Sequence, residues 1–168
     1  GDIVTVRPSG SCTQDVAVAA IGGRELVLDA SGCVQTDLFA SVRDGTGRFS
    51  APLAVAADPG RNEGWEPPGE VFHGLAVTGA RDRFGVVYID AAPQGQPNDS
   101  HWRLVELDPS GRPLGHPRDL TTEFGLRLFN WPVLELRYDD LRDRYFLDWT
   151  GFGPTGYGLW IVEVSPRR

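Results

Sequence analysis

At residues 75–89 the chain reads Leu75-Ala-Val-Thr-Gly-Ala-Arg-Asp-Arg83-Phe-Gly-Val-Val-Tyr-Ile89. Two apolar segments flank a tight turn that ends on Arg83, and this pattern predicts an antiparallel β-hairpin. The same pattern occurs at residues 15–28 and at 133–149, where the turn arginines are Arg24 and Arg144. Successive turn arginines are 59 and 61 residues apart. A near-constant period of this length indicates a protein built from repeats.

The composition is that of one globular domain. The 168 residues are 40% hydrophobic and 23% charged, so residues 1–168 can bury a single core. The net charge of −7 repels phosphate groups, which makes nucleic acids and anionic membranes poor partners. No apolar segment approaches the ~20 residues needed to cross a bilayer, so no membrane insertion is expected.

Each hairpin is followed by further strand-like segments, which predicts three repeats at residues 13–57, 72–121 and 131–164. In the second repeat a more polar fourth strand is expected over 113–120, after the turn at 108–111. The third repeat stops after Val164 without a fourth strand, and residues 1–8 are expected to supply this strand and close the structure. The inner strands are apolar on both faces, as in β-propeller blades pressed between their neighbours.

The sequence therefore predicts an all-β protein of three four-stranded, antiparallel, blade-like units. Propellers close with about 4–8 blades, so closure requires either a homo-oligomer, in which two chains form a ring, or a longer parent chain. A β-sandwich or barrel is the alternative, although sandwich strands show a cleaner alternation of polar and apolar residues.

The two cysteines are predicted to form a disulfide bond. A hairpin that turns on Gly22-Gly23 places Cys12 opposite Cys33 if its register continues without a bulge. Their Cα atoms would then lie about 4.5 Å apart, as in a non-hydrogen-bonded antiparallel pair, within the range that a disulfide requires. A disulfide indicates an oxidising compartment, so a secreted or periplasmic location is expected. Two buried free thiols are the alternative.

The repeats resemble those of secreted bacterial β-propeller proteins, of the sialidase or lectin-like kind. The resemblance rests on an apolar strand, a turn with Asp-Arg, a second strand, and a later strand followed by Asp-x-x-Gly-Arg-Pro-x-Gly, and it is best over 75–121 and 132–164. The stretch 41–49, Ser-Val-Arg-Asp-Gly-Thr-Gly-Arg-Phe, is similar to the Asp-box turn of sialidase-type propellers, with one residue inserted before Asp44. The resemblance implies a fold and a structural role for such turns, and it names no activity.

Loop length indicates where a ligand would bind. In an up-and-down unit, the first-to-second and third-to-fourth connections lie at one end and the remaining connections at the other. The first group is short, whereas the second contains the long segments 58–73, 91–100, 122–131 and 150–157. Long loops on one end of a rigid scaffold commonly carry binding sites. The candidate ligand-binding residues are aromatic, acidic, amide and imidazole side chains of these segments and their borders: Trp65, Glu66, His73, Asp90, Asp99, Asn130, Trp131, Phe152 and Tyr157.

Aromatic rings beside carboxylates and amides suit sugars, so a carbohydrate-binding module is the first functional hypothesis. Trp65 is the best single candidate because its neighbours are polar, whereas Trp131 and Trp149 fit packing between blades better than contact with a ligand. A sialidase-like glycoside hydrolase is the second hypothesis, with Glu66, Asp90, Asp99 and Asp148 as possible carboxylates. A protein–protein assembly or adhesion domain is the third.

The histidines show no metal-ligand spacing, and the chain has no nucleophile elbow or phosphate-binding loop. Calcium is possible at two acidic groups, the cluster Asp139, Asp140 and Asp143 and the pair Asp90 and Asp99. Solvated acidic turns are the alternative, because the first group lacks the glycine and terminal Glu of a helix–loop–helix site. No other cofactor is expected.

Overall fold

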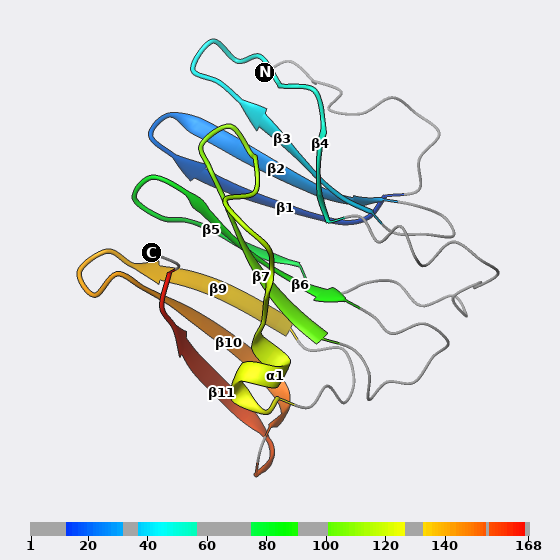
Figure 1. Ribbon diagram of the computed structural model, residues 1–168, viewed down its shortest axis with the longest axis vertical. Coiled ribbons are helices and arrows are strands. Elements are labelled where there is room, and N and C mark those ends of the chain that lie inside the picture. The colour runs from blue at the N-terminus through cyan, green and yellow to red at the C-terminus, as the bar shows by residue number, and fades with distance from the viewer. Residues whose placement is uncertain are drawn as a thin grey trace, which may run out of the picture.

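The computed structural model describes residues 13–31, 37–56, 75–90, 101–126, 133–153 and 155–166. This part of the chain is all-β apart from one short helix, and it forms three antiparallel sheets of four, four and three strands. The sheets lie one beside the next in chain order (Figure 1). The all-β class and the three repeated sheets are as predicted, whereas closure into a propeller stays a prediction.

The strands follow one another along each sheet as a simple meander. The first sheet contains β1 (Thr13–Ile21), β2 (Arg24–Ser31), β3 (Asp37–Arg43) and β4 (Leu53–Ala56). The second contains β5 (Ala76–Gly79), β6 (Phe84–Asp90), β7 (His101–Leu107) and β8 (Arg118–Asp119), after which the chain forms helix α1 (Leu120–Phe124). The third contains β9 (Val133–Asp139), β10 (Arg144–Gly153) and β11 (Gly156–Val164).

The first hairpin turns where the sequence predicts it. Gly22 and Gly23 have φ angles of +52° and +76°, which residues with a Cβ adopt only under strain. The predicted register holds from the pair Ile21–Arg24 as far as Asp15–Ala30, and it then shifts, so that Thr13 pairs with Ser31. Cys12 and Cys33 lie outside the described residues. The irregularity nevertheless precedes them, so the register from which their disulfide was predicted does not extend to the cysteines.

The second sheet is covered by a neighbour on both faces. Its residues Phe84, Val86, Val105 and Leu107 share one apolar cluster with the first sheet, through Leu26, Leu28, Ala40 and Val42 among others. On its other face, Val87, Trp102 and Leu104 share a second cluster with Leu136, Leu147 and Trp149 of the third sheet. The first strands of the three sheets, β1, β5 and β9, also contact one another in sequence. Face-to-face burial explains why the inner strands are apolar on both sides.

Two glycines let the sheets approach closely. A Cβ on Gly79 would lie 2.3 Å from the backbone oxygen of Ala20 on the first sheet, and a Cβ on Gly85 would lie 2.5 Å from Cε1 of Tyr145 on the third. Both distances are far shorter than ordinary van der Waals contact. Residues 79 and 85 therefore have room for a hydrogen atom only.

Three expectations about local structure are wrong. The fourth strand predicted over 113–120 is reduced to β8, Arg118–Asp119. The loop predicted over 122–131 begins inside helix α1, because Asp119 caps the helix by accepting a hydrogen bond from the amide of Thr122, and Gly125 ends it in the left-handed conformation. The loop predicted over 150–157 is the tip of a hairpin, in which β10 and β11 stay paired to Gly153–Gly156.

We expect Gly85→Ala to lower the free energy of unfolding by about 1–3 kcal/mol, the usual cost of overpacking a core. The added methyl group must displace the buried ring of Tyr145. Urea denaturation measures the effect. Gly158→Ala on β11 is the matched control, since its Cβ would lie 3.7 Å from Nε1 of Trp160 and should leave stability almost unchanged. Equal effects of the two variants would contradict close packing at Gly85.

Candidate functional site

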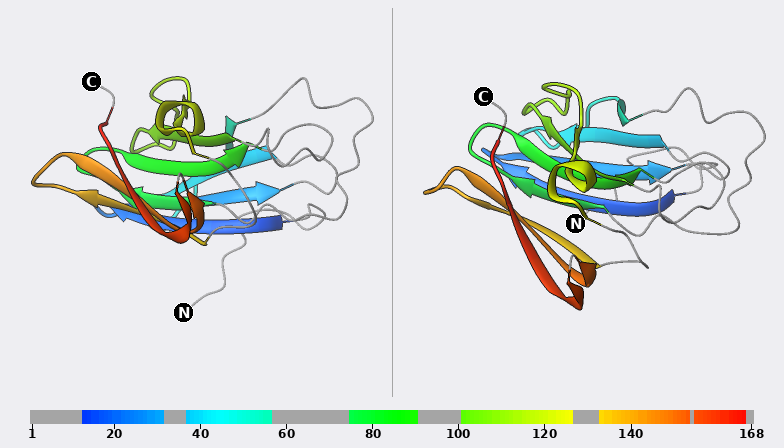
Figure 2. Two further views of the ribbon diagram at one scale, coloured as in Figure 1. Left: turned by 90° about the horizontal axis from the view of Figure 1, so that it is seen from below. Right: turned by 60° about the horizontal axis from the view of Figure 1, so that its bottom comes forward.

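The two ends of the sheet stack differ in their connections. At one end, named the short-turn end, the described turns join β1 to β2, β5 to β6 and β9 to β10 directly. At the opposite end, named the long-loop end, lie the strand termini that border residues 57–74, 91–100 and 127–132; the strands of the first two sheets end on one side in Figure 2. By strand direction, helix α1 and the β10–β11 hairpin tip belong to this end of their own sheets. The predicted segregation of connections therefore holds for the described strands, except that residues 150–157 form a hairpin tip.

Most of the predicted ligand-binding residues lie outside the described part of the chain, namely Trp65, Glu66, His73, Asp99, Asn130 and Trp131. Three have a described backbone position. Asp90 ends β6 and pairs with His101, while Phe152 and Tyr157 are cross-strand partners at the β10–β11 hairpin tip. The Tyr157 side chain is 71% exposed. All three positions are at the long-loop end.

A polar cluster at this end was missed by the sequence analysis. Nδ1 of His101 lies 2.8 Å from Oδ2 of Asp119, and a guanidinium nitrogen of Arg103 lies 3.3 Å from the same oxygen. The hydroxyl groups of Thr121 and Thr122 complete the cluster, since Thr121 accepts from the amide of Trp102 and Thr122 donates to Asp119. We call these five residues, His101, Arg103, Asp119, Thr121 and Thr122, the His101 cluster.

Two strands and a helix terminus position the His101 cluster. His101 and Arg103 are two residues apart on β7, so their side chains point to the same face of the second sheet. Asp119 pairs with Arg103 across β7 and β8 and is also the N-cap of α1. Burial would raise the pKa of Asp119, but the Thr122 hydrogen bonds and the charges of Arg103 and His101 outweigh it and hold this pKa below its ordinary value. The carboxylate is therefore ionised at neutral pH.

The sequence carried a partial signal for this cluster. Asp119 is followed by Thr122 and Glu123 and then by Gly125, which is a helix start and stop pattern. The pairing of His101 with Asp119 depends on the two-residue strand β8, which has no recognisable periodicity. The spacing between histidines along the chain is a signal for a metal site, and it cannot identify a His–Asp pair.

Behind the cluster lies a row of tryptophans between the second and third sheets. The rings of Trp102 and Trp149 meet edge to face with centroids 4.8 Å apart, and Trp149 and Trp160 stack with centroids 6.3 Å apart. Trp102 and Trp149 are only 1% and 3% exposed. These two rings are core residues, so the packing interpretation of Trp149 is correct.

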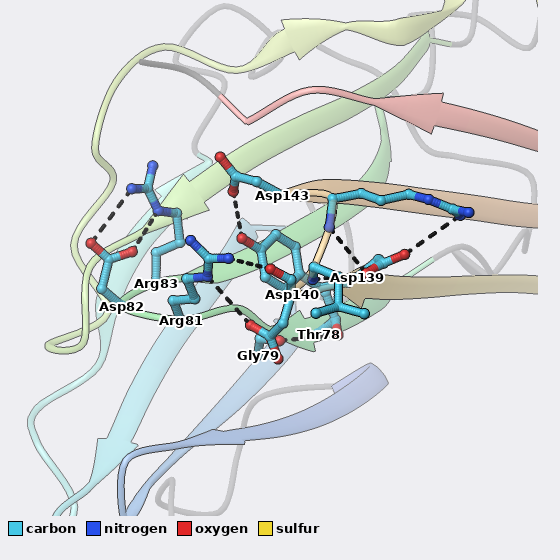
Figure 3. A network of polar contacts seen from close by, with 11 residues as sticks. Thr78, Gly79, Arg81, Asp82, Arg83, Asp139, Asp140 and Asp143 are labelled. Carbon is cyan, nitrogen blue, oxygen red and sulfur yellow. Dashed lines mark hydrogen bonds and ion pairs between the residues drawn. The ribbon is translucent and has the colours of Figure 1, made fainter.

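The short-turn end is held together by polar contacts between sheets. Arg81 of the second sheet reaches the backbone oxygen of Asp140 on the third (Figure 3). The hydroxyl group of Tyr145 donates to the buried carboxylate of Glu106 at 3.1 Å, and Arg83 lies 3.5 Å from the same oxygen. Burial, followed by the Glu106 charge, raises the pKa of Tyr145, so the phenol stays protonated. These contacts join the sheets.

The carboxylates of Asp139, Asp140 and Asp143, in the acidic turn at the short-turn end, do not converge on one point, because each has a different partner. Asp139 accepts the amides of Leu141 and Arg142, Asp140 faces Arg81, and Asp143 accepts the hydroxyl group of Tyr138 at 2.5 Å. Burial and this hydrogen bond raise the pKa of Tyr138 to about 12. Among the residues that the structure describes, no group of three His, Cys, Asp or Glu side chains is placed to hold a metal ion.

The Asp-box-like stretch is one of two matching structural turns. Oδ1 of Asp44 accepts from the amide and hydroxyl groups of Thr46, at 2.8 and 2.6 Å, and from the amide of Arg48 at 3.1 Å. Asp108 makes the same three contacts with Ser110 and Arg112, at 2.8, 2.6 and 3.0 Å. In both turns a glycine, Gly47 or Gly111, has a positive φ angle. The motif Asp-x-Ser/Thr-Gly-Arg is therefore a self-contained turn between the third and fourth strands.

A cavity of about 400 Å³ lies on the second sheet and is lined by Arg83, Leu104, Glu106 and His116 among others. The corresponding residues of the first sheet are Arg24, Ala40 and Val42. These receive the Asp108 turn, since Arg24 donates to the Pro109 oxygen at 3.2 Å and Gly111 packs against Val42. The part of the third sheet that would correspond to this turn lies outside the described residues, which end at Pro166.

The comparisons with known proteins give no family. No protein-family model, no curated protein and no solved structure matches this chain. The one helix among the described residues, α1, has five residues. This part of the chain therefore contains no helix that is long and apolar enough to cross a membrane.

We expect Asp108→Asn to destabilise the protein most near neutral pH. The hydrogen bonds from Ser110 and Arg112 hold the pKa of Asp108 below its ordinary value of 3.8, although burial opposes them. A carboxyl group with a lowered pKa stabilises the fold above its unfolded pKa, and this contribution disappears as the pH falls through the folded pKa. The difference in unfolding free energy between wild type and variant should therefore shrink from about pH 6 to about pH 3. A difference independent of pH would contradict this role.

Proposed function

We propose that the protein is a binding module whose ligand-binding surface is the long-loop end of the sheet stack, and that its ligand is a carbohydrate. The observation that carries this proposal is the placement of the His101 cluster beside the strand termini that border the long connections. The cluster offers a carboxylate, an imidazole, a guanidinium and two hydroxyl groups, which are the donors and acceptors that sugar hydroxyls use.

An exposed aromatic ring supports the same ligand class. Tyr157 is 71% exposed at the hairpin tip of β10 and β11, at the same end of the stack as the His101 cluster but on the face of the third sheet that points away from the second, so it would contact a different part of an extended sugar chain. A pyranose ring stacks its C–H face on such a ring, while its hydroxyl groups need polar partners nearby. Trp65, Trp131 and the other loop residues named from the sequence are proposed to contribute to this surface.

The proposal includes the location and the wider architecture. We place the protein outside the cytoplasm, secreted or periplasmic, and we keep the bond between Cys12 and Cys33 in the proposal, although the register shift next to Thr13 removes the geometric argument for it. We interpret the three sheets as consecutive blades of a propeller-like arc. Support for the arc comes from the contact of β1 with β5 and of β5 with β9, since first strands of neighbouring blades meet near a propeller axis.

A protein ligand is the second candidate. The exposed Tyr157, Leu159 and Ile161 of the third sheet favour it, because aromatic and large apolar side chains are typical of protein interfaces. The sialidase-like hydrolase is the weaker alternative. Among its suggested carboxylates, Asp148 is bound by Arg137 on the third sheet, and no side-chain geometry is described for Glu66, Asp90 or Asp99.

A glycan array probed with the wild-type protein, followed by titration of the best sugar, tests the proposal. We expect His101→Ala to weaken sugar binding by about tenfold or more, the equivalent of one to two hydrogen bonds. His116→Ala is the matched control, because His116 is exposed near the cavity of the short-turn half. Tyr157→Ala and Trp65→Ala test the aromatic part. A silent array together with a specific protein partner would favour the second candidate, and unchanged affinity of His101→Ala would remove the cluster from the site.

The proposed disulfide has its own measurement. We expect alkylation of the unreduced protein to leave its intact mass unchanged, and alkylation after reduction to label both cysteines. Two labelled thiols in the unreduced sample would show that the bond is absent, and the argument for an oxidising compartment would then be lost.

A further inference from the structure

The carboxylate of Asp119 determines which hydrogen bonds His101 can make. Four groups converge on it, namely Nδ1 of His101 at 2.8 Å, the amide and hydroxyl groups of Thr122 at 3.0 and 2.8 Å, and a guanidinium nitrogen of Arg103 at 3.3 Å. Although burial acts in the opposite direction, the Thr122 hydrogen bonds and the charges of Arg103 and His101 hold the pKa of this carboxyl group below its ordinary value. An ionised carboxylate only accepts hydrogen bonds, so the proton between the two side chains is carried by Nδ1 of His101.

The position of this proton decides what the imidazole ring presents to a ligand. A neutral imidazole has one protonated nitrogen and one nitrogen with a free lone pair. With the proton on Nδ1, Nε2 of neutral His101 is a hydrogen-bond acceptor. Nε2 is the ring nitrogen that Asp119 does not use, and the His101 side chain is 36% exposed. The ring therefore offers a ligand a lone pair rather than an N–H group.

We propose that the His101 cluster binds a neutral sugar, which donates a hydrogen bond from a hydroxyl or acetamido N–H group to Nε2 of His101, and that Asp119 is the positioning residue for this contact. The inference rests on the proposed carbohydrate-binding function and names the class of sugar. A carboxylate or sulfate group only accepts hydrogen bonds and cannot pair with the lone pair of Nε2. Uronic and sialic acids are therefore expected to bind more weakly than neutral sugars.

The charges of the cluster also favour a neutral ligand. Arg103 and Asp119 lie 3.3 Å apart, and their formal charges cancel when the imidazole is neutral. Beside the cluster, Arg118 of β8 and Glu123 of α1 form a second ion pair. The whole chain has a net charge of −7, which repels anionic ligands. An acidic sugar would need the opposite, an excess of positive charge around its carboxylate.

The protonation of the two ring nitrogens can be measured without a ligand. Correlation spectra of ¹⁵N-labelled protein distinguish a protonated ring nitrogen from a bare one, and the spectrum of His101→Ala assigns the signals. We expect neutral His101 to have a protonated Nδ1 and a bare Nε2. Asp119→Ser keeps a side-chain oxygen that can cap α1, but its shorter, uncharged side chain cannot hold the ring, so this preference should be lost. The signals of His116 are the internal control and should stay unchanged, and melting curves check that each variant is folded.

Matched pairs of sugars test the ligand class. A glycan array followed by titration compares methyl β-glucoside and methyl β-galactoside with the corresponding uronic acids, and N-acetyllactosamine with its sialylated form. We expect the neutral member of a bound pair to have at least about tenfold higher affinity, and Asp119→Ser to weaken its binding by about threefold to tenfold. Replacing single hydroxyl groups of the bound sugar by fluorine, which cannot donate, should weaken binding to the wild type at one position and leave binding to His101→Ala almost unchanged.

The outcomes separate this inference from the proposed function. A protonated Nε2 in neutral His101, or a preference for the acidic member of the pairs, would overturn the inference and leave carbohydrate binding in place. A proton that stays on Nδ1 in Asp119→Ser would remove Asp119 from its positioning role. A silent array would overturn the sugar ligand itself, whichever nitrogen carries the proton.

Discussion

The burial of the second sheet on both of its faces is the constraint on which the rest of this structure depends. Residues that follow the turn arginine divide alternately between the two neighbours. Phe84 and Val86 pack toward the first sheet, while Gly85 and Val87 pack toward the third. Neither face can carry a charge without a partner, because an ionised group in such an interface loses its hydration. Glu106, the buried acid among the side chains of this sheet that the structure describes, is accordingly bonded by Tyr145 and Arg83.

The corresponding positions of the outer sheets obey a different rule. After the turn arginine of the first sheet, the face directed away from the stack carries Glu25, Val27 and Asp29, and in the third sheet the equivalent face carries Phe146, Asp148 and Thr150. Repeat proteins commonly place polar residues on their terminal faces, which keeps the stack soluble. The most exposed apolar residues of these faces, Val16 and Val18 on β1 and Leu159 and Ile161 on β11, lie on strands at the margins of the described sheets, whereas the apolar Val27 and Phe146 lie on inner strands.

Sequence reasoning was most accurate where local chemistry decides the structure. Gly22-Gly23 fixed the first hairpin, and the Asp-x-Ser/Thr-Gly-Arg motif forms the same turn in two sheets. Prediction from the sequence failed where contacts between residues far apart in the chain determine the local structure. No residue near Thr13 signals the register shift in the first hairpin. Glycines 151, 153, 156 and 158 suggest a loop, although they lie in strands that stay paired as far as the hairpin tip. The His101 cluster is a third example, because residues 101 and 119 meet only through the pairing of β7 with β8.

The stacking of the sheets also determines how the molecule can open. Contacts of the first sheet with the second and of the third with the second are separate clusters, each with its own set of side chains. Either outer sheet can therefore detach while the other interface persists, and partial unfolding need not be all-or-none. The backbone amides of β6 and β7 lie in the layer that both interfaces cover, so among the described residues we expect these strands to exchange most slowly and to lose their structure last.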